Sequence, residues 1–219
     1  MLLKPGTMAV NYSLYLVTDS TLAMGRPLPD VVRTALDGGV TCVQVREKDL
    51  PSRAYIEQLL SVRPLLRERG IPLFVNDRVD VALAVEADGV HLGQTDLPLA
   101  MARRVAAGRL VIGVSCESVQ DATDAERGGA DYVSVSPIFA TPTKTDTAPA
   151  LGLDGVRAVR RAVRVPVVAI GGINATNAAD VIRAGADGIC VVSAIVSAPD
   201  PRAAATSLRG IVEGARHGA

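Results

Sequence analysis

The chain is predicted to be an α/β protein folded as a single (β/α)8 TIM barrel, on three observations. Short runs rich in Val, Ile and Leu recur eight times and alternate with segments of helical spacing. A Gly-containing joint precedes several of these runs, as expected where a helix ends in the left-handed conformation and a strand follows. An open nucleotide-binding sheet would carry a GxGxxG turn after its first strand, whereas Thr18-Asp19-Ser20-Thr21 stands there.

The expected strands are short and apolar almost throughout, as strands buried on both faces of a parallel sheet are. In chain order they are 14–18, 40–46, 73–76, 89–92, 111–115, 132–136, 167–170 and 189–193. Apolar residues at intervals of three and four predict helices at 53–69, 79–86, 98–106, 119–127, 156–163 and 175–184. The joints that resemble one another are Asp37-Gly38-Gly39-Val40, Glu86-Ala87-Asp88-Gly89, Gly128-Gly129-Ala130-Asp131 and Gly185-Ala186-Asp187-Gly188.

The length of 219 residues suits one small barrel without a second domain. We expect the barrel to be the catalytic domain and to occupy residues 12–213. Loose tails are expected at residues 1–11 and 214–219, because the last segment is rich in Gly and Ala.

The composition argues against several classes of protein. The 23 Lys and Arg residues balance 23 Asp and Glu residues, so no net field would attract nucleic acid or an anionic membrane. Four Tyr, two Phe and no Trp are too few for base stacking, and no apolar run reaches the length of a membrane span. The cysteines Cys42, Cys116 and Cys190 are odd in number and widely spaced, which argues against disulfides. We expect a cytoplasmic protein without nucleic-acid or membrane partners.

Polar residues that follow the expected strands form the candidate active site, because the site of such a barrel lies at the carboxyl ends of its strands. After the second strand, alternation points Gln44, Arg46 and Lys48 the same way. Asp77 and Asp96 follow the third and fourth strands. Two carboxylates at neighbouring strand ends suit Mg²⁺, completed by water and phosphate oxygens. Together with the neighbouring cations they indicate a diphosphate site.

These residues also have structural interpretations. Asp77 and Asp96 could each cap the following helix, and the segment from Asp96 to Pro98 resembles a helix start. Ser115 could contact phosphate or could be a hydroxyl at a helix entry. The residues that could instead form a solvated strand end with a weak ion pair are Arg46, Glu47 and Lys48.

Two further segments point to phosphate. Gly171-Gly172 and Val192-Ser193 follow the seventh and eighth strands, where these barrels commonly hold phosphate on backbone N–H groups, although a Gly pair alone is an ordinary turn. The connection 140–151 is long and rich in Thr and Pro, which is typical of a lid, and it would carry Lys144 to the site. A Schiff base at Lys144 is disfavoured because this lysine lies on a loop. His91 is expected to be a hydrogen-bonded structural residue. A barrel zinc site with two or more histidines is excluded, because the only other histidine, His217, lies in the expected tail.

Five sequence blocks stand in order at successive expected strand ends. They are Gln44-Val45-Arg46-Glu47-Lys48, Asn76-Asp77-Arg78, His91-Leu92-Gly93-Gln94 with Asp96, Ala140-Thr141-Pro142-Thr143-Lys144 and Gly171-Gly172-Ile173. Together they resemble the thiamine phosphate synthase family over nearly the whole chain. The resemblance implies a transferase of thiamine biosynthesis that joins hydroxymethylpyrimidine diphosphate to thiazole phosphate, giving thiamine phosphate and pyrophosphate.

The resemblance also implies a role for each of the matching residues. The pyrimidine substrate would be bound by Gln44, Val45, Arg46, Glu47, Lys48, Asn76, Ser115 and Lys144. The thiazole phosphate would be bound by Thr141, Pro142, Thr143, Gly172, Val192 and Ser193. Mg²⁺ would be held by Asp77 and Asp96, and charge on the departing pyrophosphate would be stabilised by Arg46, Lys48, Ser115 and Lys144.

Two other functions are compatible with the same fold. A thiazole tautomerase of the same superfamily would transfer a proton and would not need diphosphate-binding groups. A catalytically silent module that binds thiamine precursors could lose the metal carboxylates. The presence of both Asp77 and Asp96 favours the synthase, for which a dissociative route needs no general base because the thiazole nitrogen is already nucleophilic. A homo-oligomer is possible, with no interface identified.

Overall fold

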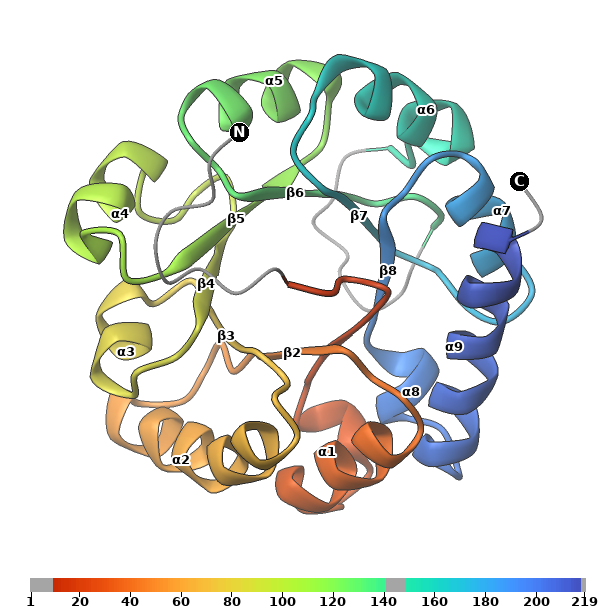
Figure 1. Ribbon diagram of the computed structural model, residues 1–219. Helices are drawn as coiled ribbons and strands as arrows, with labels where there is room; N and C mark the ends of the chain where they lie inside the picture. The colour runs from red at the N-terminus through yellow and green to blue at the C-terminus, as the bar shows by residue number, and fades with distance from the viewer. Residues whose placement is uncertain (1–9, 141–148, 218–219) are drawn as a thin grey trace.

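The expected strands form one closed parallel barrel in the computed structural model, which describes residues 10–140 and 149–217 (Figure 1). The strands are β1 Leu14–Val17, β2 Cys42–Val45, β3 Leu73–Asn76, β4 Gly89–Leu92, β5 Val111–Cys116, β6 Tyr132–Val135, β7 Val167–Ile170 and β8 Gly188–Val191. Each strand pairs in parallel with the next, and β8 closes the ring by pairing with β1. The predicted (β/α)8 barrel is confirmed.

Helices surround the barrel on its outside (Figure 1). They are α1 Leu28–Asp37, α2 Ser52–Glu68, α3 Val79–Ala84, α4 Leu99–Ala106, α5 Val119–Arg127, α6 Gly152–Ala162, α7 Ala178–Arg183, α8 Ser193–Val196 and α9 Pro201–His217, with a 3-10 turn at Thr21–Ala23. The start of α7 lies later than predicted because an asparagine turn occupies the preceding residues. Asn174 Oδ1 accepts from the Thr176 N–H at 2.9 Å, and Asn177 Oδ1 accepts from the Asn174 N–H at 2.9 Å.

The larger hydrophobic core lies between the barrel and the helices. Strand side chains such as Leu16 and Val45 pack there with helix side chains such as Leu59 and Val62 of α2. Fully burying one Leu or Val side chain contributes roughly 1.5–3 kcal/mol. Because side chains alternate along a strand, this layer also decides which strand residues face the barrel interior.

A second, smaller cluster fills the interior of the barrel with aromatic rings. It contains Tyr12, Tyr15, Phe74 and Tyr132, which are four of the six aromatic residues of the chain. The rings of Phe74 and Tyr132 meet edge to face with centroids 5.7 Å apart. Gly113 of β5 makes room for Tyr132, because a side chain at this position would collide with the Tyr132 ring. These four aromatic residues are therefore buried inside the barrel rather than displayed on a binding surface.

The last helix corrects the expected C-terminal boundary. α9 continues to His217, so residues 214–217 are helical rather than part of a loose tail. Ala215 is 3% exposed, and the Arg216 guanidinium donates to Ser13 Oγ at 2.5 Å and to the Asp187 carbonyl. α9 also packs against α1 and α7, which secures the end of the chain beside its beginning.

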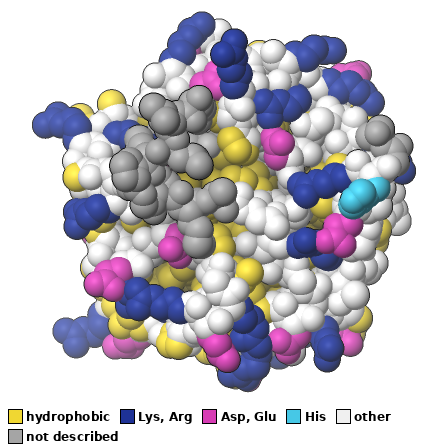
Figure 2. Space-filling model, viewed as in Figure 1, with side chains coloured by type: hydrophobic (Ala, Val, Ile, Leu, Met, Phe, Trp, Pro, Cys, Tyr) yellow, Lys and Arg dark blue, Asp and Glu magenta, His cyan; other side chains and the backbone are white. Residues whose placement is uncertain are grey.

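Charged side chains of both signs lie interspersed around the outside of the molecule on the face shown in Figure 2. This distribution agrees with the balanced charge of the chain, and the described residues visible on that face form no extended patch of one sign. Within residues 10–140 and 149–217, no helix has both the length and the apolarity to cross a membrane.

Candidate active site

A tyrosine of α2 ties together the ends of β2 and β3. Tyr55 Oη donates to the Val45 carbonyl at 2.6 Å and accepts from the Asn76 N–H at 3.1 Å. This hydroxyl fixes the relative height of the two strand ends, and the next residues along the chain are Arg46 and Asp77. Sequence reasoning did not find Tyr55, because one aromatic residue on the buried face of a helix gives no sign of its polar partners.

Two carboxylates approach each other at this rim. Asp77 directly follows β3, and its N–H donates to the His91 carbonyl of β4 at 2.8 Å. Asp96 Oδ2 accepts from the Gly93 N–H at 2.7 Å. Burial raises the pKa of Asp77 to about 6, and a hydrogen bond and the negative charge of Asp96 act in the same direction. The two carboxyl groups therefore lie within hydrogen-bonding range of each other.

Neither aspartate caps a helix, so the capping interpretation is wrong for both. α4 begins at Leu99 after Pro98, and α3 begins at Val79 after Arg78. Within the part of the chain that the structure describes, neither helix start has a side-chain cap. Asp77 also has a backbone φ of +63°, a left-handed conformation that costs a residue with a side chain about 1–3 kcal/mol.

Two cationic side chains stand beside the carboxylates. Lys48 Nζ lies 3.6 Å from Asp77 Oδ2, with half of the Lys48 side chain exposed. Arg46 Nη1 lies 3.4 Å from Asp19 Oδ2, and the backbone N–H of Arg46 donates to Thr18 Oγ1 at 3.1 Å. Asp19 was not among the predicted residues, although its place directly after the first strand could have indicated it.

Glu47 and Val45, the sequence neighbours of Arg46, contact other parts of the protein. Glu47 Oε2 accepts from Ser20 Oγ at 2.8 Å, and burial raises the pKa of the carboxyl group. Glu47 Oε1 is buried and has no hydrogen-bond partner among the described residues. The side chain of Val45 lies in the outer core among the helices. A contact of either residue with a ligand remains a prediction.

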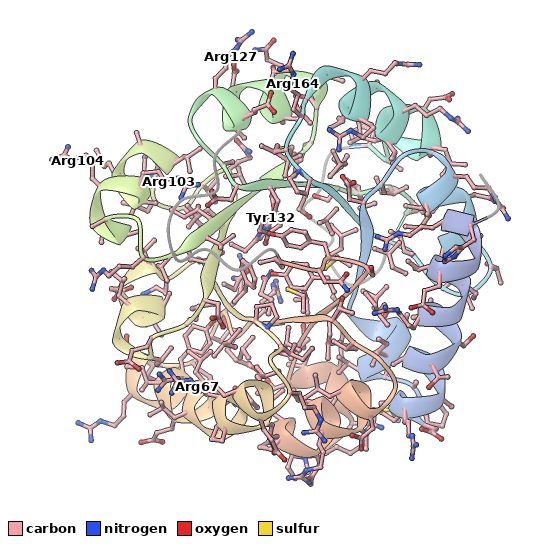
Figure 3. All side chains as sticks on the ribbon, viewed as in Figure 1. Arg67, Arg103, Arg104, Arg127, Tyr132 and Arg164 are labelled. Carbon is pink, nitrogen blue, oxygen red and sulfur yellow. The ribbon has the colours of Figure 1, made fainter. Side chains whose placement is uncertain are left out.

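A line of five buried or partly buried polar side chains crosses the barrel interior and ends at β5. We call it the interior chain, and its members are Gln44, Tyr15, Tyr132, His91 and Ser115. Gln44 Nε2 donates to Tyr15 Oη at 3.0 Å, and the two tyrosine hydroxyls lie 3.2 Å apart. His91 Nδ1 lies 2.8 Å from Tyr132 Oη, and His91 Nε2 lies 2.9 Å from Ser115 Oγ. Figure 3 shows Tyr132 in the middle of the barrel.

The helix-entry interpretation of Ser115 is wrong, whereas its contact with phosphate remains a prediction. The hydroxyl that caps α5 belongs to Ser118, whose Oγ accepts from the Asp121 N–H at 3.0 Å, so Ser115 is not the helix-entry residue. His91 is hydrogen-bonded on both ring nitrogens, as predicted, and burial lowers its pKa to about 4, which leaves the ring neutral. The tyrosines of the interior chain were missed, because their alternation in strands indicates burial but not partners.

The glycine turn after β7 packs closely against the segment after β6. Gly171 and Gly172 have φ values of +106° and +66°. A Cβ atom at Gly172 would lie 2.7 Å from the Ala140 carbonyl oxygen and 2.8 Å from the Phe139 Cβ, so no other residue fits. Val192 and Ser193 follow β8, and α8 begins at Ser193. These residues occupy the strand ends at which phosphate was predicted.

The remaining predicted residues, Thr141, Pro142, Thr143 and Lys144, lie outside the described residues. Among the residues that are described, no group of three or more His, Cys, Asp or Glu side chains could hold a metal ion. A cation at Asp77 and Asp96 would therefore rely on water and ligand oxygens for its other positions. This is the coordination that Mg²⁺ prefers.

The fold and the rim define an enzyme class, a (β/α)8 barrel that gathers carboxylates and cations from several strand ends. The family model described as thiamine monophosphate synthase matches residues 14–195. The chain belongs to the thiamine monophosphate synthase family.

Individual relatives agree with this assignment. The chain is 57% identical over 203 residues to the thiamine-phosphate synthase of Chloroflexus aurantiacus, covering 93% of this chain and 94% of the relative. It is 55% identical over 200 residues to that of Albidiferax ferrireducens, covering 91% of each. The solved structure of a thiamine phosphate pyrophosphorylase from Pyrococcus furiosus superposes with a TM-score of 0.88 at 45% identity, covering 94% of this chain and 98% of that one.

Proposed function

We propose that the protein is a thiamine phosphate synthase that joins hydroxymethylpyrimidine diphosphate to thiazole phosphate, releasing pyrophosphate. The observation that carries the proposal is the pair of converging carboxylates, Asp77 and Asp96, with Lys48 beside it. A thiazole tautomerase has no need of this arrangement, because proton transfer creates no diphosphate leaving group. Similarity to the named synthases over most of the chain supports the same activity.

We propose that Asp77 and Asp96 hold Mg²⁺ when the diphosphate binds. The fit is supported by electrostatics. Burial raises the pKa of Asp77, and the Asp96 carboxyl group within hydrogen-bonding range raises it further, because two ionised carboxylates repel each other. When bound, the divalent ion would neutralise charge that develops on the departing pyrophosphate.

The residues of the chain then have separate tasks in a dissociative substitution. The C–O bond to the diphosphate breaks, and the thiazole nitrogen attacks the pyrimidine-stabilised cation without a general base. Lys48, Arg46 and Lys144 would stabilise the leaving group. One unit charge pair at ~4 Å is worth about 4 kcal/mol at an effective dielectric constant near 20, whereas enzymes lower barriers by ~8–23 kcal/mol. Several cationic groups must therefore act together.

The thiazole phosphate is assigned to the opposite side of the rim. Gly172, Val192 and Ser193 would hold its phosphate through backbone N–H groups, with help from 141–143. Asn76 and Gln44 would contact the pyrimidine ring. We also propose a cytoplasmic location, since all three cysteines are buried and free, as in proteins of reducing compartments. A homo-oligomeric state remains a prediction.

The experiment that tests the function mixes the two phosphorylated precursors with the protein and follows pyrophosphate release and thiamine phosphate formation. We expect both products in equal amounts with Mg²⁺ and neither with excess EDTA. Product formation that is indifferent to EDTA would overturn the metal assignment. Absence of both products at every metal concentration would overturn the synthase assignment.

A further inference from the structure

The interior chain has a direction, which follows from counting protons. Gln44 Nε2 can only donate, so it occupies an acceptor position of Tyr15 Oη at 3.0 Å. The single hydroxyl proton of Tyr15 can then be donated to Tyr132 Oη, 3.2 Å away, and the proton of Tyr132 to His91 Nδ1, 2.8 Å away. In the reverse direction Tyr15 would receive two protons, and its own proton could go only to the Cys42 thiol beside it, which is a weak acceptor.

This direction selects one tautomer of His91. A neutral imidazole carries one N–H, and an imidazole that accepts at Nδ1 carries that proton on Nε2. His91 Nε2 therefore donates to Ser115 Oγ at 2.9 Å. The hydroxyl proton of Ser115 is left to point away from the histidine. Ser115 stands near the carboxyl end of β5 and is only partly buried, so this proton is available at the rim.

We propose that Tyr132 and His91 are positioning residues that hold the Ser115 hydroxyl as a hydrogen-bond donor to an anionic ligand at the rim. That the ligand is a diphosphate rests on the proposed function. The chemistry requires this polarity, because phosphate oxygens are acceptors and need donors. A serine that donated its proton to His91 would instead present lone pairs to the anion.

The surroundings keep the interior chain in one arrangement. Tyr15 and Tyr132 are almost fully buried, and His91 is 8% exposed. The Tyr132 ring is held between Phe74 and Tyr12, whose ring centroid lies 4.7 Å away. In a close-packed interior such rings cannot reorient without cost, so the hydroxyl directions persist before any ligand binds.

The first test reads the tautomer of His91 by ¹⁵N NMR of the ligand-free protein near pH 8. The only other histidine provides an internal contrast, because His217 Nδ1 lies 2.7 Å from the Glu213 carbonyl, which can only accept. We expect His91 to be protonated on Nε2 and His217 on Nδ1, with His217→Gln used to assign the signals. A His91 ring protonated on Nδ1 would overturn the proposal.

The second test uses Tyr132→Phe, which removes the donor to His91 and leaves the ring. We expect affinity for inorganic pyrophosphate in the presence of Mg²⁺ to fall about tenfold, the effect of one lost charge-assisted hydrogen bond. In a Ser115→Ala background the same substitution should change affinity less than about twofold, because the group it positions is gone. Equal losses in both backgrounds would overturn the proposal and would mark Tyr132 as merely structural.

Tyr12→Phe is the matched control, since its ring packs against Tyr132 while its hydroxyl makes none of the bonds of the interior chain. We expect its pyrophosphate affinity to equal that of the unmodified protein. Because binding of pyrophosphate is measured without the organic substrates, the result decides the positioning roles even if the condensation itself is not observed. Failure of the condensation alone counts only against the proposed function.

Discussion

Asp77 combines features that folding alone does not require. Its backbone is left-handed at a residue with a side chain, and its carboxyl group faces a second carboxyl group. The backbone conformation opposes stability at any pH, and the facing carboxyl groups oppose it when both are ionised. A residue kept under such conditions, with Lys48 Nζ 3.6 Å away, is better explained by ligand binding than by packing.

Replacement of Asp77 by Asn tests this explanation. Asn tolerates the left-handed backbone and keeps the size of the side chain, but it removes the charge. We expect a normal fold and a loss of about 100-fold or more in the rate of pyrophosphate release. Asp80→Asn is the control, since Asp80 is exposed on α3 and paired with Arg78, and it should retain the full rate. A fast Asp77→Asn enzyme would contradict the assignment.

The same residue predicts a pH dependence of stability. The pKa of Asp77 is raised to about 6 in the folded protein, against roughly 3.9 in an unfolded chain. Folding therefore favours the protonated form, and this contribution is complete below about pH 4 and lost as the pH rises through about 6. Without metal, the free energy of unfolding of the unmodified protein relative to Asp77→Asn should fall over this interval. Urea unfolding in EDTA measures it, and a rise over the interval would contradict the assignment.

Strand β5 depends on a glycine that has no room for a side chain. A Cβ atom at Gly113 would meet the ring of Tyr132, which is buried on all sides. We expect Gly113→Ala to lower the free energy of unfolding by about 1–3 kcal/mol, because overpacking in a closed interior forces neighbouring side chains to shift. The shift should also weaken the interior chain and the activity.

A glycine in helix α9 offers a matched substitution, which is expected to change the free energy of unfolding in the opposite direction. Gly210 lies in this helix, is exposed, and has open space around its Cβ position. Gly210→Ala should raise the free energy of unfolding by about 0.5–1 kcal/mol, because Ala lowers the conformational entropy of the unfolded chain. Urea unfolding of the two variants compares them directly. Equal effects of the two substitutions would show that the space around each glycine does not matter.

The whole molecule is closed twice, once by β8 pairing with β1 and once by α9 packing between α1 and α7. The second closure includes Arg216 on Ser13, which joins positions 203 residues apart in the chain. Because β1 and β8 are neighbours in the ring, closure of the barrel depends on contacts between the two ends of the chain.

Truncation after Glu213 tests the second closure. It removes Ala215 and Arg216 with their contacts, and we expect a loss of about 1–3 kcal/mol in the free energy of unfolding and a lower Tm. Truncation after His217 is the control and should leave both quantities unchanged. A chain ending at Glu213 that is as stable as the full chain would restore the original view of residues 214–217 as a tail.

Most of the fold was predictable because its signals are local. Buried strands in a parallel barrel are continuous apolar runs, and β3 and β4 begin and end where the pattern predicts. The meeting of Asp77 and Asp96 was also predictable, since residues after neighbouring strands share one rim. Helix starts were less predictable where a side chain competes for backbone hydrogen bonds, as Asn174 does before α7.

By itself the sequence determined the barrel and the family and predicted residues for the rim, all of which depend on order along the chain. Only the tertiary structure decided the interior chain, in which Tyr15 and Tyr132 meet across 117 residues, and the direction of Val45 into the outer core. The physical reason is that a hydroxyl finds its partner through ring closure and packing. A periodic pattern reports which side chains are buried, but not which of them touch.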